Sequence, residues 1–357
     1  MKYTIVDYDQ LQSETIDWLR FPLVILVLFI HTVQPPEMFA SDSAVFNIYY
    51  AVSKIFAAIA VPCFFVISGY YFFYTKTNPV SFTKQEYIKK LKKRIHSVLV
   101  PYIVWNFFGF ALLVVSQYLF PYDLFSGKYK DIADYNLTDY IDVFTGLTTH
   151  YPIVNQLWYL RDLMLLVLIS PVIYFLMTRY KHFFVAVLFL VYMLPLNVNI
   201  TKSLFFFSAG GYFALNGINI IKEIRKLSVY PIIVYCAIFI FLLGYKDLLV
   251  SQYISKLGII FGIISILYIA SSYVEKFSVK ANRKLVSISF FIYLWHGLFT
   301  HTFHSLILKL YPESGLYYLF TYFFSVFITV VISFAGYYIL TNKYFPKKLK
   351  DLLIGGR

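Results

Sequence analysis

The sequence predicts an all-α protein, a polytopic membrane bundle of about ten transmembrane helices. Three observations lead to this fold class. Of its 357 residues 60% are apolar and only 14% are charged, which is too hydrophobic for a soluble domain of this length. The apolar residues form windows long enough to cross a bilayer. The basic residues gather in alternate segments between those windows.

Ten apolar windows are separated by polar, proline-containing or glycine-containing breaks, and each window predicts one helix. The windows lie near residues 17–33, 45–74, 97–120, 155–176, 182–198, 203–217, 229–245, 253–274, 286–308 and 317–341. We expect them to form a single membrane-embedded domain over residues 1–357, with no soluble domain appended.

The basic residues indicate how the helices are oriented. With a cytoplasmic N-terminus, the inside segments hold 22 lysines and arginines and the outside segments hold six, while Arg20, Lys54 and Arg161 lie within spans. Cytoplasmic loops of membrane proteins carry such an excess. Both termini are therefore predicted to be cytoplasmic. Topology accounts for nearly all of the formal net charge of +13, so we expect no nucleic-acid partner.

The first window carries Arg20 and His31, eleven positions apart. Eleven residues make almost three helical turns, so both side chains project from one face, about 16 Å apart along the axis. Ionisable groups within a bilayer usually face a bundle interior or a water-filled path. The pair predicts a buried working site with Arg20 near the cytoplasm. The alternative is an interfacial arginine anchor and a hydrogen-bonded histidine at a helix end.

The second window ends in VPCFFVISGYYFF. Pro62 permits a kink there, and Ser68 and Gly69 allow either close helix packing or a polar contact with a ligand.

Two connecting segments are long. The inside segment that runs into the third window includes Lys93, Arg94 and His96. It either contacts anionic lipids and sets orientation, or receives a polyanion such as a nucleotide. The outside segment, residues 121–154, is acidic and tyrosine-rich, and its IDVFTGL stretch favours a short amphipathic helix. It either shapes an acceptor site or is a solvated loop.

Two later windows carry polar groups at membrane depth. In NQLWYLRDL, Trp158 and Arg161 share a face and Asp162 adjoins them, which predicts an internal ion pair or a substrate contact. In SISFFIYLWHGLF, Tyr293 and His296 share a face near mid-span.

Several chemistries lack the residues they need. His301 and His304 are spaced i, i+3, but two histidines without a third ligand make a weak metal site. The sequence contains no GxSxG elbow, P-loop or HExxH motif, so serine hydrolases, ATPases and zincins are not indicated. Transfer or transport across the membrane remains.

Five of these motifs occur in an order that resembles the acyltransferase-3 family of bacterial integral membrane acyltransferases, over essentially the whole chain. They are the arginine and histidine of the first span, FFVISGYYF, the basic run into VPY, QLWYLRDL and SFFIYLWHG. The resemblance implies a bundle in the bacterial cytoplasmic membrane that moves an acyl group, usually acetyl, from cytoplasmic acyl-CoA to a hydroxyl. The acceptor would be an extracytoplasmic glycan or a lipid-linked saccharide, and no metal would be needed.

The resemblance also implies roles for individual residues. Arg20 and His31 match the catalytic pair, and Arg94 matches the cytoplasmic arginine motif. The family often has a second arginine where this chain has Ser97. The expected donor-binding residues are Arg94, Lys93, His96, Ser68 and Gly69. The expected acceptor-binding residues are Trp158, Arg161, Tyr293 and His296.

Under this hypothesis the phosphates of acyl-CoA lie near Arg20 and Arg94, and His31 is the general base for the acceptor hydroxyl. The chain would hand the acyl group directly to the acceptor or to a separate partner. A glycan transporter or flippase without transferase chemistry is the alternative, since it also needs charge and aromatic side chains within the membrane. A non-enzymatic partner of a separate transferase is a third interpretation, in which Arg20 and His31 would be dispensable.

Overall fold

The structure of the protein is a computed structural model that describes residues 7–35, 43–75, 82–119, 130–196, 198–310 and 313–356. These residues form helices and no strand, which confirms the all-α class. Five of the helical segments are long and apolar enough to cross a membrane, or six if α8 (Asn199–Leu215) and α9 (Ile220–Lys226), bent by 97°, are one span. The chain is therefore a polytopic membrane bundle. The ten crossings and the cytoplasmic termini stay predictions.

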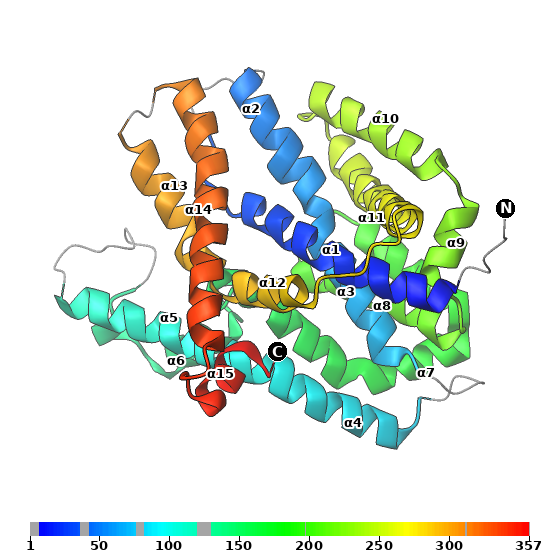
Figure 1. Cartoon of the computed structure of the whole chain (residues 1–357), viewed down its shortest axis with the longest axis horizontal. Helices are drawn as coiled ribbons and strands as arrows, with labels where there is room; N and C mark the ends of the chain where they lie inside the picture. Colours follow the sequence, from blue (N-terminus) through cyan, green and yellow to red (C-terminus); the bar gives the residue numbers. More distant parts are fainter. Residues whose placement is uncertain are drawn as a thin grey trace.

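Helix α1 (Tyr8–Ile30) crosses the middle of the bundle (Figure 1). It packs against α3 (Ala60–Phe73), α11 (Ser251–Lys276) and α12 (Arg283–Trp295). It begins well before predicted residue 17, because the Asp7 side chain accepts hydrogen bonds from the backbone N–H groups of Asp9 and Gln10 and so caps the helix. The part of α1 up to Arg20 carries Glu14 and Asp17 as well, and the part after Arg20 is apolar. One central helix thus joins a charged end to an apolar end.

The second predicted span is one continuous helical segment of changing geometry. It comprises α2 (Ala44–Tyr49), the π-helical η1 (Tyr50–Phe56), the 3-10 helix η2 (Ala57–Ile59) and α3 (Ala60–Phe73). Pro62 cannot donate an N–H to the carbonyl of Ala58, and the irregular turns lie just before it.

The third predicted span extends backwards into the basic run. Helix α4 (Lys84–Arg94), the π-helical η3 (Ile95–Leu99) and α5 (Val100–Leu119) are continuous. Lys90 in α4 donates its ammonium protons to the carbonyls of Tyr71, Phe72 and Tyr74, at 3.3, 2.7 and 2.5 Å. These carbonyls lie at the end of α3, where a helix has no backbone donors left. The basic helix is thereby anchored to the end of α3.

The outside segment contains η4 (Ile132–Asp134) and α6 (Leu137–Thr145), so the expected short helix is confirmed. Residues 120–129 of this segment lie outside the described residues. The next helices are η5 (Asn155–Leu157) and α7 (Trp158–Met193). Helix α7 joins two predicted windows and is interrupted between them at Lys181, whose φ is 46°.

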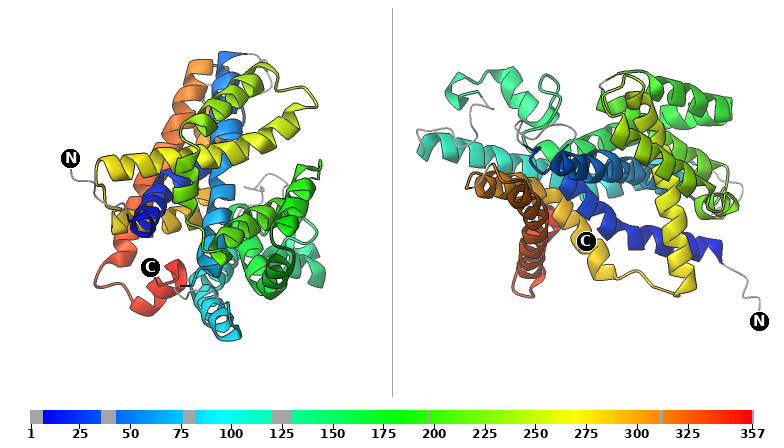
Figure 2. Two further views of the ribbon diagram at one scale, coloured as in Figure 1. Left: turned by 90° about the vertical axis from the view of Figure 1, so that its right-hand side faces the viewer. Right: turned by 90° about the horizontal axis from the view of Figure 1, so that it is seen from above.

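The remaining helices lie in the predicted windows, except α15, which follows the last of them. They are α10 (Tyr230–Gly244), α11 (Ser251–Lys276), α12 (Arg283–Trp295), η6 (His296–Leu298), α13 (Thr300–Leu308), α14 (Gly315–Thr341) and α15 (Lys347–Ile354). The window at 286–308 is therefore not one helix, because η6 interrupts it at His296. Helix α15 lies against α5 (Figure 2), where the indole N–H of Trp105 donates to the carbonyl of Leu353 at 3.0 Å.

Helices α3 and α8 form a close contact through two glycines. A Cβ on Gly69 would lie 1.9 Å from the carbonyl oxygen of Phe207, and a Cβ on Gly210 would lie 2.0 Å from that of Val66. Small residues let membrane helices approach in this way. The α7–α8 contact adjoins this one, so the two glycines fix α8 between α3 and α7.

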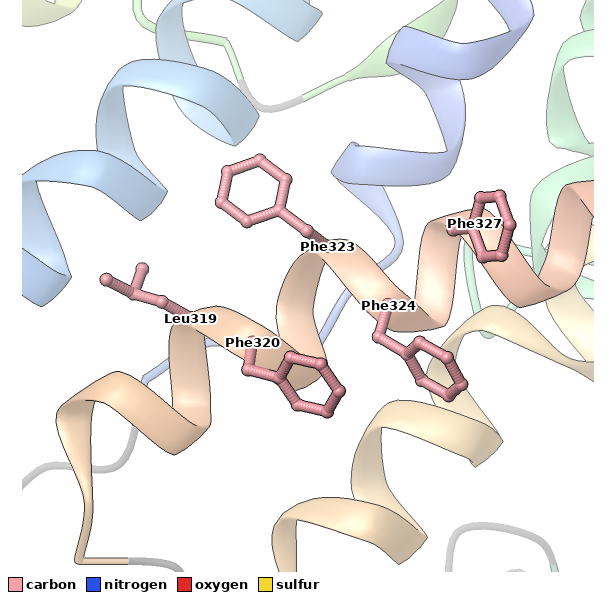
Figure 3. Close-up of a pocket in the computed structure, with 5 residues that line it drawn as sticks. All are labelled: Leu319, Phe320, Phe323, Phe324 and Phe327. Carbon is pink, nitrogen blue, oxygen red and sulfur yellow. The ribbon is translucent and has the colours of Figure 1, made fainter.

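Helix α14 presents an aromatic face to the outside of the bundle. Figure 3 shows its side chains Leu319, Phe320, Phe323, Phe324 and Phe327, which line an apolar surface hollow. Phe320 and Phe327 are 59% and 60% exposed. Such a face on a membrane bundle suits contact with lipid tails.

Candidate functional site

His31 lies at the C-terminal end of α1, at the cap position. Two residues later Val33 is held from both sides. Its N–H donates to Nδ1 of His304 in α13 at 3.0 Å, and its carbonyl accepts from the Tyr318 hydroxyl in α14 at 2.8 Å. The turn that carries His31 is thus fixed by two helices from the far end of the chain.

The His31 ring faces the ring of His296, with centroids 5.0 Å apart and planes at 55°. His296 is fully buried at the start of η6. Its Nδ1 lies 2.8 Å from the carbonyl oxygen of Tyr293 and 3.2 Å from that of Ile292. Its Nε2 has no hydrogen-bond partner among the described residues. The structure therefore brings together His31, Tyr293 and His296, which lie in two separate sequence motifs.

Tyr293 lies next to the His31–His296 pair, and Tyr159 lies next to Tyr293. The Tyr293 hydroxyl donates to the carbonyl of Gln156 at 2.6 Å, and its ring lies 5.7 Å from that of Tyr159. The Tyr159 hydroxyl is 3.0 Å from that of Ser68. A Cβ on Gly297 would lie only 2.1 Å from the Gln156 side chain, so the break at η6 fits closely against η5. These contacts hold the two tyrosines in place.

Arg20 lies at the other end of α1, in a network of charges. Its Nε donates to Asp17 at 3.0 Å. Asp17 also pairs with Arg283 of α12, which lies 3.6 Å from Glu14. Arg94 is half-buried and lies within electrostatic range of Arg20. Because Arg20 uses only Nε in the described part of the chain, both terminal nitrogens of its guanidinium remain available to an anion.

The other expected donor-binding residues have different surroundings. Lys93 and His96 are exposed. Ser68 is nearly buried, and its hydroxyl is hydrogen-bonded to the Tyr159 hydroxyl. Gly69 packs against the backbone of α8, as the packing alternative expects. Of this set, Arg94 lies within electrostatic range of Arg20 and Tyr159, and Ser68 contacts the Tyr159 hydroxyl.

Arg161 pairs with Asp162 at 2.9 Å, which is the internal ion pair that the sequence left open. The buried carboxylate also accepts from Ser203 at 3.0 Å. A terminal nitrogen of Arg161 donates to the carbonyls of Thr145 and His150 at 2.9 and 3.1 Å. Arg161 therefore holds the outside segment against α7.

Trp158 lies one turn earlier in α7. The ammonium of Lys202, from the first turn of α8, lies 5.3 Å from the centre of its ring, a cation–π distance. This arrangement places a cation and an aromatic face beside the Arg161 pair.

The outside segment has its own capping pair at the start of α6. Asp139 accepts the backbone N–H of Asn136 at 2.8 Å and the ammonium of Lys130 at 3.0 Å. These two bonds, the backbone one first, lower the pKa of the partly exposed Asp139 carboxyl below its ordinary value.

The sequence reasoning missed several residues of the site. Asp17 had a readable signal, because it lies three positions before Arg20 on one helix. Arg283, Lys202 and Gln156 had none, because each acts through a contact between distant helices. Nδ1 of His304 is used by Val33, and no group of three His, Cys, Asp or Glu side chains in the described ranges is arranged to hold a metal.

Comparison with known proteins agrees with the resemblance read from the motifs. The chain is similar to the succinoglycan biosynthesis protein ExoH of Rhizobium meliloti (strain 1021), with 28% identity over 214 residues. That alignment covers 58% of this chain and 55% of that protein, so it spans about half of each. No solved structure matches significantly. Residues 13–338 match the model of a family described as an acyltransferase domain, and the chain therefore belongs to the acyltransferase-3 family.

Proposed function

We propose that this protein transfers an acyl group, acetyl in the simplest case, from cytoplasmic acyl-CoA to a hydroxyl of an envelope glycan or lipid-linked saccharide. It would act in the bacterial cytoplasmic membrane. Membership of the acyltransferase-3 family supports the transferase chemistry. The similarity to ExoH, which is named for the biosynthesis of succinoglycan, supports a glycan acceptor.

One observation carries the proposal. Helix α1 connects the charged network around Arg20 with the ring pair of His31 and His296, and the two lie about three turns apart. Arg20 and Arg94 supply guanidinium groups at the first end. One guanidinium group can donate two parallel hydrogen bonds to the oxygens of a phosphate. A donor whose phosphates bind there directs its thioester along α1, past Tyr159 and Tyr293, toward His31.

At the His31 end the acceptor hydroxyl is the nucleophile. His31 removes the hydroxyl proton while the oxygen attacks the carbonyl carbon of the thioester. The carbon–sulfur bond then breaks, CoA leaves as its thiolate, and the proton held by His31 is returned to the thiolate or to water. The product is an ester on the glycan, and the histidine is restored.

The test is acyl transfer in inside-out vesicles supplied with radiolabelled acetyl-CoA, and then with longer or acidic acyl-CoA. We expect label on a lumenal glycan with the wild type. We expect a loss of at least about 100-fold in rate with His31→Ala, since acid–base groups contribute 10²–10⁴-fold. His182→Ala, which removes an exposed histidine of α7, is the matched control and should keep full activity.

Arg20→Ala should lose activity mainly through weaker binding of the donor. If CoA is released from none of the donors, and His31→Ala and Arg20→Ala both match the wild type in glycan export, the enzyme proposal fails. A transporter then becomes the better account.

A further inference from the structure

Among the described residues, two buried histidines near the site each have a hydrogen-bond partner at one ring nitrogen and none at the other. In His296 and in His304 the nitrogen with a partner is Nδ1, and the nitrogen without one is Nε2. This holds among the described residues. Buried polar atoms usually have a partner, so each of these two atoms needs an explanation.

The partners of Nδ1 assign the tautomer of His296. Both are backbone carbonyl oxygens, of Tyr293 and Ile292, and a carbonyl can only accept. Nδ1 must therefore carry the proton. In a neutral imidazole the other nitrogen then has a free lone pair. His296 offers an acceptor at Nε2, on the ring edge that points away from its own helix backbone.

His304 has the opposite tautomer. Its Nδ1 accepts the backbone N–H of Val33, so it carries no proton. The proton of the neutral ring is then on Nε2, which is a donor. The two histidines share burial and a free Nε2 but differ in the chemistry that this atom can do.

We infer that His296 is a positioning residue for His31, whose ring N–H it accepts at Nε2 during acyl transfer. This inference rests on the proposed function. The ring centroids are 5.0 Å apart, and two imidazoles joined by a direct N–H to N bond have centroids about 5 Å apart, since such a bond spans about 2.9 Å. The other titratable groups that face the pair in the described structure are Lys54, His301 and Tyr293.

The contact gives His31 a defined role for each nitrogen. One nitrogen donates to Nε2 of His296, so the other has the lone pair that removes the proton from the acceptor hydroxyl. When His31 becomes protonated, the same bond becomes charge-assisted and stabilises the cation. His296 itself gains and loses no proton, and no bond to substrate is formed.

The same substitution at His296 and at the exposed His182 of α7 tests this role. In His296→Asn the amide N–H can replace Nδ1–H, but nothing occupies the place of Nε2. We expect kcat to fall about 100-fold with KM for the acceptor unchanged, and the acid limb of the kcat profile to move to lower pH. In His182→Asn, which changes an exposed histidine of α7 outside the site, we expect less than a threefold change. His296→Gln, which reaches the Nε2 position with an oxygen acceptor, should recover about tenfold over His296→Asn.

A second measurement does not depend on activity. Nitrogen-15 NMR of histidine-labelled protein in bilayers should show the proton on Nδ1 for His296 and on Nε2 for His304. The inference is overturned if His296 has the Nε2–H tautomer, or if His296→Asn keeps the wild-type kcat and pH profile. A raised KM with normal kcat would also overturn it, because His296 would then contact the acceptor. If the wild type itself transfers no acyl group while the tautomers are as expected, the proposed function fails instead.

Discussion

Helices α1 and α12 lie side by side and contact each other at both ends, but the side chains that make the two contacts differ in chemistry. At the end that we predict to be cytoplasmic, Asp17 and Glu14 of α1 pair with Arg283, whose side chain is 66% exposed. At the other end the two helices meet through His31 and His296, where the buried His296 ring is held by backbone carbonyls.

The difference follows from where water can reach. At the first end the exposed Arg283 remains hydrated, and the half-buried Glu14, Asp17 and Arg20 are paired with opposite charges, so these groups can gather there at small cost. Charges deep in a bundle cost several kcal/mol unless they are paired, so the second end uses neutral rings and backbone groups. We therefore expect the charged end to control binding of the donor, and the neutral end to control the rate of the chemical step.

Among the variants that test this division between the two ends, the largest effect should come from Arg20→Lys. Lysine keeps the charge but loses the planar fork, so we expect KM for acyl-CoA to rise about tenfold with kcat nearly unchanged. Initial rates against donor concentration measure both constants. Raising salt should weaken donor binding by the wild type, because exposed charges are screened. A fall in kcat with constant KM would contradict the division between the two ends.

A smaller effect is expected from Tyr318→Phe, which removes the hydroxyl that donates to the Val33 carbonyl. Leaving a buried acceptor without its donor costs about 1–3 kcal/mol. Part of that cost should appear as misplacement of His31, with kcat about fivefold lower and KM for the donor unchanged. Tyr338→Phe, at an exposed position of the same helix, is the control and should match the wild type. Equal kcat for both variants would show that the turn needs no support from α14.

The smallest effect is expected in the exposed outside segment, from Asp139→Asn. Because the folded pKa of Asp139 is lowered, its contribution is complete above the ordinary carboxyl pKa of 3.8 and is lost as the pH falls through the lower folded value. At pH 7 the variant should exchange the amide hydrogens of α6 about threefold faster than the wild type. Below the folded pKa of Asp139 the two proteins should exchange alike, and a difference that persists there would rule out the charged cap.

Much of the architecture could be predicted, because a helix that crosses a bilayer needs a long apolar stretch of sequence. Each window holds a helix in the described structure, and the break between the fourth and fifth windows appears at Lys181. The start of α1 was predicted too late, because its first two turns are polar and depend on the Asp7 cap. The break at His296 had no signal, since its stretch of sequence is as apolar as a continuous helix.

The candidate site could be predicted in part. Arg20 and His31 stand out as ionisable residues in an apolar window, and Tyr293 and His296 share a face by spacing alone. Their meeting with His31 depends on the packing of α12 against α1, which periodicity does not encode. The pairing of Arg283 with Asp17 had no signal for the same reason, since 266 positions separate them.

The clamp on Val33 has a consequence for how the protein is made. Its two partners lie 271 and 285 positions further along the chain, in α13 and α14. During synthesis the first helix enters the membrane long before either partner has left the ribosome. The turn that carries His31 can take its final form only after α14 has been inserted and packed. A chain that ends before α14 could therefore bind donor at its charged end and still lack transferase activity, so that the insertion of α14 sets when that activity begins.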